Sequence, residues 1–204
     1  TVNRLTTHSK PMGFEAELLL LELRMAATLT AETAGQGRLR LGLRLSNRGE
    51  TPVQVKTAFP HIAGLEADYY LFPYCGGIIA DVPTYLRTAY GENTAWWQMI
   101  DVFRPAEGCG LSVRIEDEAG GYKCPVLRKG DRYDDEYGRD EAGRLMDPGA
   151  LWKRSLAPVP GVSLGFEYLR RTVAAGAALQ LPPAVLGVHE GDWHNALAEY
   201  AKWA

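Results

Sequence analysis

A chain of 204 residues is long enough for one sizeable domain, and β-sandwiches of this length commonly form a single unit. Its hydrophobic content of 46% and charged content of 23% are those of an ordinary globular protein, which argues against extensive disorder. The net charge is −3 and no predicted element carries a basic stripe, so nucleic acid is excluded as a partner.

The N-terminal part contains the longest apolar run of the chain, AELLLLEL at 16–23. Glu17 and Glu22 interrupt this run, which is far too short to span a bilayer, so we expect no membrane partner. The chain begins at Thr1 without a signal-peptide pattern and without an initiator methionine. We therefore expect it to be part of a longer protein, and the missing signal leaves its compartment open.

Alternating patterns predict β-strands through most of the chain. In RLRLGLRLS, residues 38–46, the leucines share one face and the arginines the other, which is typical of a strand with one buried side. A second alternating run, TPVQVKTAF at 51–59, comes after a short polar turn, so we predict an antiparallel hairpin. Further strands are predicted near 14–24, 28–33, 69–73, 96–103, 110–116, 162–173 and 177–181.

The C-terminal sequence, HEGDWHNALAEYAKWA at 189–204, raises the question of a metal site. His189 and His194 are five positions apart, or about 140° on a helix, whereas the zinc-binding His-Glu-x-x-His pattern needs a spacing of four. A structural helix over about 192–203 explains more of the sequence, because Asp192 is a good N-cap. The apolar side chains that come next at helical spacing are Trp193, Ala196, Leu197, Tyr200 and Trp203. We expect no metal ion and no other cofactor.

Many strands and one late helix predict an all-β fold, a large antiparallel sandwich closed by a C-terminal amphipathic helix. Residues 1–204 contain no internal repeat and no convincing linker, so we expect a single domain. A (β/α)8 barrel, with about 250 residues and eight amphipathic helices, does not fit this pattern.

Catalytic signatures are absent from the sequence. It lacks GxSxG, a Walker A loop and GxGxxG, and no carboxylate pair can be assigned to glycosidase chemistry from spacing alone. The acidic segment 129–149 does not match the calcium-loop pattern, which favours a solvated surface loop. Cys75, Cys109 and Cys124 lack CxxC spacing, so we expect buried reduced thiols, with one disulfide and one free thiol as the alternative.

The segment 68–103 is rich in aromatic residues placed among glycines and prolines. Aromatic faces stack on the apolar faces of sugar rings, and polar side chains bind sugar hydroxyl groups, so this segment is a candidate carbohydrate platform. The alternative is that many of these aromatic side chains fill the sandwich core. The candidate carbohydrate-binding residues are Trp96, Trp97, Tyr85, Arg87, Tyr90 and Asp101.

A family resemblance rests on the order of several short motifs. These are LGLRLSNRGETPVQV at 41–55, FP at 59–60, YYLFPYCGG at 69–77, YG at 90–91, WQMIDVF at 97–103, GCGLSVRIED at 108–117 and GDWHNALAEYAKW at 191–203. In this order they resemble the N-terminal galactose-mutarotase-like β-supersandwich domain of poorly characterised bacterial glycoside hydrolases. The resemblance covers most of the chain.

The resemblance implies a non-catalytic accessory domain of a glycoside hydrolase. In that family the closing helix leads into a (β/α)8 catalytic barrel, which is then the expected partner in the same protein, with glycan as a further partner. The expected compartment is the periplasm or the cell exterior, and no catalytic residue transfers to this chain. Two alternatives stay open. One is an aldose-epimerase-like enzyme using His61, His189 and Glu190, and the other is a free-standing carbohydrate-binding module.

Overall fold

A computed structural model describes residues 4–91, 94–130 and 161–204. The strands are β1 Arg4–Lys10, β2 Gly13–Leu20, β3 Met25–Thr33, β4 Arg38–Asn47, β5 Val53–Leu65, β6 Tyr69–Phe72, β7 Ile78–Ala80, β8 Thr84–Arg87, β9 Met99–Arg104, β10 Cys109–Ile115, β11 Cys124–Lys129, β12 Val162–Val173, β13 Ala178–Gln180 and β14 Ala184–Glu190. The helical elements are the short η1 Leu21–Leu23 and the α-helix α2 Trp193–Trp203. Every segment predicted as a strand contains one, and β1, β7, β8, β11 and β14 are additional.

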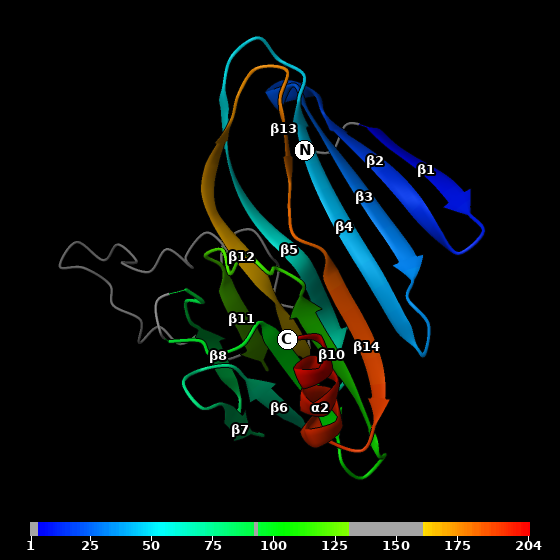
Figure 1. The fold of residues 1–204 in the computed structure, drawn as a ribbon, viewed down its shortest axis with the longest axis vertical. Helices are drawn as coiled ribbons and strands as arrows, with labels where there is room; N and C mark the ends of the chain where they lie inside the picture. The colour runs from blue at the N-terminus through cyan, green and yellow to red at the C-terminus, as the bar shows by residue number, and fades with distance from the viewer. Residues whose placement is uncertain (1–3, 92–93, 131–160) are drawn as a thin grey trace, which may run out of the picture.

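The strands form two antiparallel sheets that face each other, as Figure 1 shows. The larger sheet has ten strands in the order β1-β2-β3-β4-β14-β10-β9-β6-β7, with β13 also paired to β4. The smaller sheet has four strands in the order β5-β12-β11-β8. The predicted all-β antiparallel sandwich is therefore confirmed.

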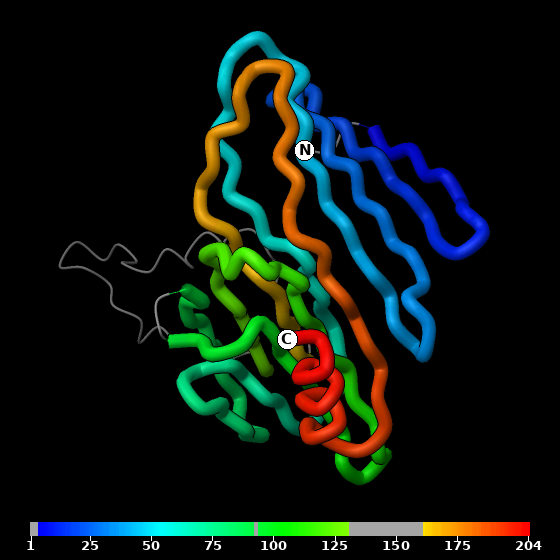
Figure 2. Tube along the Cα trace, viewed as in Figure 1, coloured from blue at the N-terminus to red at the C-terminus, as the bar shows by residue number. Residues whose placement is uncertain are grey.

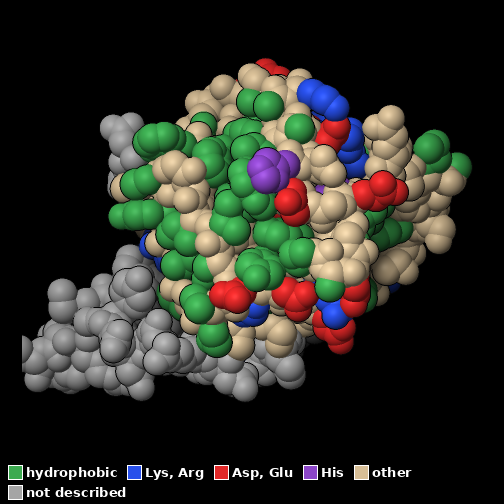
Figure 3. Space-filling view, turned by 90° about the horizontal axis from the view of Figure 1, so that it is seen from below, with side chains coloured by type: hydrophobic (Ala, Val, Ile, Leu, Met, Phe, Trp, Pro, Cys, Tyr) green, Lys and Arg blue, Asp and Glu red, His purple; other side chains and the backbone are tan. Residues whose placement is uncertain are grey.

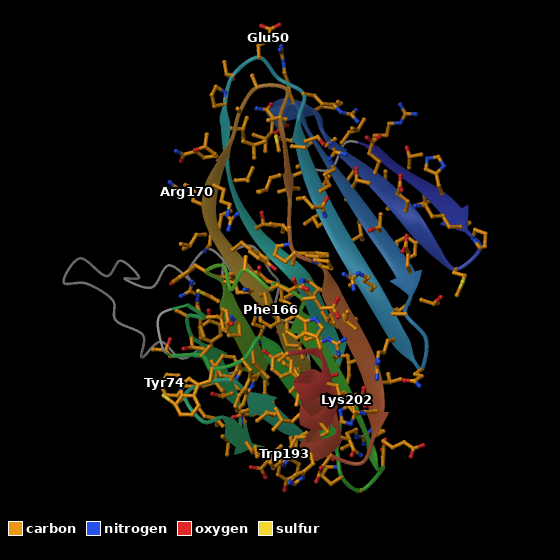
Figure 4. The ribbon with its side chains drawn as sticks, in the orientation of Figure 1. Glu50, Tyr74, Phe166, Arg170, Trp193 and Lys202 are labelled. Atoms are coloured by element: carbon orange, nitrogen blue, oxygen red, sulfur yellow. The ribbon has the colours of Figure 1, made fainter. Side chains whose placement is uncertain are left out.

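The main core lies between the two sheets. Its buried side chains come from alternate positions of strands in both sheets, because successive side chains of a strand point to opposite faces. Phe166 on β12 and Ile100 on β9 are completely buried there, and Figure 4 shows Phe166 among the side chains at the centre of the molecule. Figure 2 shows that β1 to β3 extend the larger sheet beyond the smaller one, and only Met25, at the start of β3, contributes a buried side chain of these strands to this core.

The predicted hairpin between residues 38–46 and 51–59 is wrong. β4 pairs with β3, β13 and β14, whereas β5 pairs with β12 in the other sheet. Alternation shows that each strand has one buried side, but it does not identify the neighbouring strand. The connection is held instead by Asn47, whose side-chain amide donates to the carbonyl oxygens of Thr51 and Val173 at 2.8 and 3.0 Å. This polar side chain joins the two sheets at one end of the sandwich.

The C-terminal helix α2 begins as its sequence predicts. The carboxylate of Asp192 accepts a hydrogen bond from the backbone N–H of His194 at 3.0 Å, which caps the helix. The helix packs on the outer face of the larger sheet, against β9, β10 and β14. In the described part of the chain, no helix has the length and apolar character needed to cross a membrane.

Candidate functional site

The structure separates the six predicted carbohydrate-binding residues. Tyr85 and Arg87 lie on β8 in the smaller sheet, and Asp101 lies on β9 in the larger one. Trp97, Tyr90 and Trp96 lie in the connection between these two strands. The six side chains thus occupy several environments on both sheets.

The outer face of the smaller sheet carries a buried ion cluster. Glu167 on β12 is only 2% exposed, although its neighbours Phe166 and Tyr168 point into the core and it points the other way. The Nε of Arg87 lies 3.0 Å from its carboxylate, and the Nζ of Lys56 lies 3.5 Å away. Two cations therefore flank one carboxylate, which is the arrangement that a buried acidic group requires.

Arg87 and two further groups on this side of the smaller sheet, His61 and Tyr85, share this environment. Burial acts to lower the pKa of Arg87, but its electrostatic interactions with Cys124 and Glu167 outweigh this effect. The pKa of Arg87 is therefore raised. Burial lowers the pKa of His61, because it disfavours the charged imidazolium. Tyr85 is buried against Val126. This face provides fixed polar groups on a rigid sheet.

Asp101 lies on the opposite sheet, under α2, and is completely buried. One carboxylate oxygen lies 2.9 Å from Nε2 of His189 on β14, and the other has no hydrogen-bond partner in the described part of the chain. Burial raises the pKa of Asp101 despite this contact. Burial also lowers the pKa of His189, but the hydrogen bond and charge of Asp101 outweigh it, so the pKa of His189 is raised. The two residues form a coupled pair that holds β9 to the end of β14.

Trp97 and α2 form a second, smaller apolar cluster on the same side. Leu71, Met99 and Ala196 are its buried members, and Trp97 and Trp193 pack against them. The backbone N–H of Gln98 donates to the hydroxyl oxygen of Tyr200 at 3.0 Å. Trp193, which Figure 4 shows at the start of α2, therefore anchors the helix to the sandwich.

Trp96 and Tyr90 differ from the other candidates. The side chain of Trp96 is 65% exposed, the most accessible of the tryptophans and tyrosines that the structure describes as exposed. Tyr90 is half-buried, and the ammonium group of Lys123 lies 4.5 Å from its ring centroid. Of the six candidates, Trp96 therefore presents the largest free aromatic surface.

The histidines of the C-terminal motif have separate partners within the domain. His194 Nδ1 lies 2.9 Å from the carboxylate of Asp192, while His189 contacts Asp101. His61 lies on β5 in the other sheet, so the structure does not bring it to His189 and Glu190. Within residues 4–91, 94–130 and 161–204, no group of three or more His, Cys, Asp or Glu side chains is arranged to hold a metal ion.

The three cysteines differ in their exposure. Cys75, Cys109 and Cys124 are all free, and only Cys124 is buried, so the expectation of buried reduced thiols holds for one of the three. The acidic residues of segment 129–149, from Asp131 onward, lie outside the described residues.

Two buried ionic features were not predicted from the sequence: the cluster around Glu167 and the pairing of Asp101 with His189. Glu167 has a signal, because it is a charged residue within the apolar run VSLGFEYL, and such a residue needs a partner. The pairing of Asp101 with His189 has no local signal, since the two residues are 88 positions apart.

Comparison with known proteins places the fold. No protein-family model matches the sequence, and no curated protein matches it. Among solved structures, an α-galactosidase from Lactobacillus brevis has a TM-score of 0.63 at 10% identity, over 100% of this chain and 28% of its own. The galactosidase domain of the α-galactosidase–sucrose kinase AgaSK has a TM-score of 0.64 at 9% identity, over 93% of this chain and 28% of its own.

A third structure agrees with these two. A variant of the GH36 α-galactosidase AgaA from Geobacillus stearothermophilus, in complex with stachyose, has a TM-score of 0.61 at 10% identity, over 99% of this chain and 29% of its own. This chain has the fold of the N-terminal domain of these enzymes. The expected β-supersandwich is thus confirmed, and the chain spans less than a third of the length of the α-galactosidases it matches.

Proposed function

We propose that the chain is a non-catalytic accessory domain of a glycoside hydrolase, and that it packs on a catalytic barrel in the same protein. One observation carries the proposal. The L. brevis α-galactosidase matches the whole of this chain with only 28% of its own length, which leaves the larger part of that enzyme for other domains. In this proposal residues 1–204 form one domain, and the activity belongs to the remainder of the parent protein.

An apolar end of the molecule supports a packing role. Large hydrophobic side chains are exposed on or beside β6 and β7, at Tyr69, Tyr74, Ile79 and Trp96. The bridge between Tyr74 and Ala95 brings the segment of Trp96 next to that of Tyr74. Figure 3 shows hydrophobic side chains gathered at this end of the molecule. An exposed patch of this kind is typical of a surface that another domain covers.

Glycan contact by the segment 68–103 is the finer part of the proposal. Its six candidates stay as predicted: Trp96, Trp97, Tyr85, Arg87, Tyr90 and Asp101. The exposure of Trp96 supports a stacking role for that side chain, since an accessible indole offers a face to a sugar ring. Buried Asp101 and Tyr85 act in this proposal only through the side chains that they support.

The first test is to read the coding sequence of the parent gene beyond the codon for Ala204. We expect about 250 or more further residues with alternating strand and helix patterns, as a (β/α)8 barrel requires. The second test compares the parent protein with residues 1–204 alone on 4-nitrophenyl α-galactopyranoside. We expect hydrolysis by the parent and none by residues 1–204. Hydrolysis by residues 1–204 would overturn the accessory role, and a parent gene without a barrel pattern would overturn the proposed partner.

A further inference from the structure

A cavity of about 590 Å³ lies beside the C-terminal end of α2. Its lining comes from the segment after β10, from Arg40 on β4, from β12, from the end of β13 and the residues after it, and from Trp203. Small-molecule sites commonly have volumes of about 300 to 1,000 Å³ and combine apolar walls with a few polar groups. The cavity is thus large enough for a ligand and is separate from the charged face of the smaller sheet and from Trp96.

Most charged side chains of the lining are already paired. Glu116 pairs with Arg40 and Arg114, and the carboxylate of Asp117 lies 2.8 Å from the Nζ of buried Lys123, which is not part of the lining. The two remaining charged side chains of the lining are Arg171 and Glu118, and they have opposite signs. The cavity therefore offers no cluster of unpaired charges of one sign to a phosphate or a cation, which points to a neutral polar ligand.

Two polar groups of the lining are available to a ligand. Tyr168 is 3% exposed, and its hydroxyl has no hydrogen-bond partner among the residues that the structure describes. Leaving a buried hydroxyl unpaired costs about 1 to 3 kcal/mol, which a ligand group can recover. The guanidinium of Arg171, which is exposed, enters no salt bridge with another described residue. Both groups lie on β12, so a rigid strand holds them at one wall.

The lining also contains a fixed acceptor and an aromatic ring. One carboxylate oxygen of Asp117 accepts from the backbone N–H of Gly121 at 2.9 Å and from Lys123. These contacts fix the side chain of Asp117, so binding does not have to order it. Trp203 adds a half-buried indole, whose flat apolar surface suits the C–H face of a pyranose ring.

We propose that this cavity binds a neutral oligosaccharide, with Trp203 against a sugar ring and with Tyr168, Arg171 and Asp117 on its hydroxyl groups. Aromatic surface, mostly paired charges, an unpaired buried hydroxyl and one fixed carboxylate meet in one cavity of sufficient size. This site would give the proposed accessory domain a ligand of its own. The proposal does not depend on whether the parent protein contains a catalytic barrel.

The test is saturation-transfer NMR on residues 1–204 with raffinose and with cellobiose, and then titration calorimetry of the sugar that responds. Tyr168→Phe removes only the unpaired hydroxyl, and Arg171→Gln changes an exposed side chain, so both variants are expected to fold. Because one hydrogen bond contributes roughly a factor of five in affinity, each variant is expected to raise Kd about five-fold. Trp203→Leu is expected to abolish binding, and circular dichroism checks that α2 persists in it.

Trp96→Ala is the matched control, because it removes an exposed aromatic ring outside the cavity. The cavity site predicts an unchanged Kd in this variant. Loss of binding in Trp96→Ala, with wild-type affinity in Tyr168→Phe and Arg171→Gln, would assign the sugar to the segment 68–103 and overturn the cavity site. No saturation transfer to either sugar would overturn it as well, and neither result depends on the presence of a barrel in the parent.

Discussion

The ring of His189 reaches Asp101 across a glycine. Nε2 of His189 lies 2.9 Å from Oδ1 of Asp101, although β10 lies between the strands that carry them. Gly110 is the residue of β10 that pairs with His189, and a Cβ at Gly110 would lie 2.4 Å from the ring nitrogen Nε2. The imidazole therefore occupies the space that a side chain on the central strand would fill.

Gly110→Ala is the direct test of this arrangement. The added methyl group must displace the imidazole, which separates it from Asp101, and we expect the free energy of unfolding to fall by about 2 kcal/mol. Gly187→Ala on β14 is the control, because its Cβ would meet its nearest atom, Oγ of Ser112, at 3.4 Å. Urea unfolding of both variants measures the difference, and equal stabilities would contradict the arrangement.

The pair also predicts a pH dependence. The pKa of His189 is raised above 6.5 in the folded state, so its contribution to stability is full below pH 6.5 and is lost as the pH rises through the folded value. The raised pKa of Asp101 acts in the same direction, because burying its charged form costs free energy at high pH. Asp101→Asn is thus expected to cost about 2 kcal/mol near pH 6 and clearly less near pH 9. A loss that is the same at both pH values in urea unfolding would contradict the coupling.

Local patterns predicted the local features of the fold. Alternation located β4 and β12, and the capping residue Asp192 located the start of α2, because these signals lie within a few neighbouring residues. Strand partners and the pairing of Asp101 with His189 depend on which distant segments meet, and local sequence patterns do not show which segments these are. For the same reason the six residues of the predicted site lie in several separate environments. Their spacing in the sequence does not show on which side of which sheet each residue lies.

Glu167→Gln tests the charged face of the smaller sheet. It removes the negative charge between Arg87 and Lys56, and we expect a loss of about 3 kcal/mol, because breaking a buried ion cluster leaves the cations uncompensated. Glu66→Gln is the control, because Glu66 is 86% exposed and lies 3.6 Å from Arg104. That surface pair is expected to contribute less than about 0.5 kcal/mol. Similar losses in the two variants would show that Glu167 is not buried in a cluster.

Tyr200→Phe tests how α2 is attached to the sheet. The variant keeps the ring in its cluster but removes the hydroxyl oxygen that accepts from the N–H of Gln98, a hydrogen bond of about 1 kcal/mol. We expect faster amide hydrogen exchange at Gln98 by NMR together with a small loss of stability. Lys202→Gln, at a side chain 72% exposed on the same helix, is expected to leave the exchange rate at Gln98 unchanged. Unchanged exchange in Tyr200→Phe would exclude this hydrogen bond.

Trp96 and Trp97 are adjacent in the sequence, but their substitution is expected to change the stability of the fold by very different amounts. Trp97 packs against Leu71 and Met99, so Trp97→Ala leaves a cavity and is expected to cost about 2 kcal/mol or more. Trp96 is 65% exposed, and Trp96→Ala is expected to change the free energy of unfolding by less than about 0.5 kcal/mol. Urea unfolding of the two variants compares them directly. If Trp96→Ala destabilises the domain as much as Trp97→Ala does, its indole belongs to the core and is not available to a sugar or to a neighbouring domain.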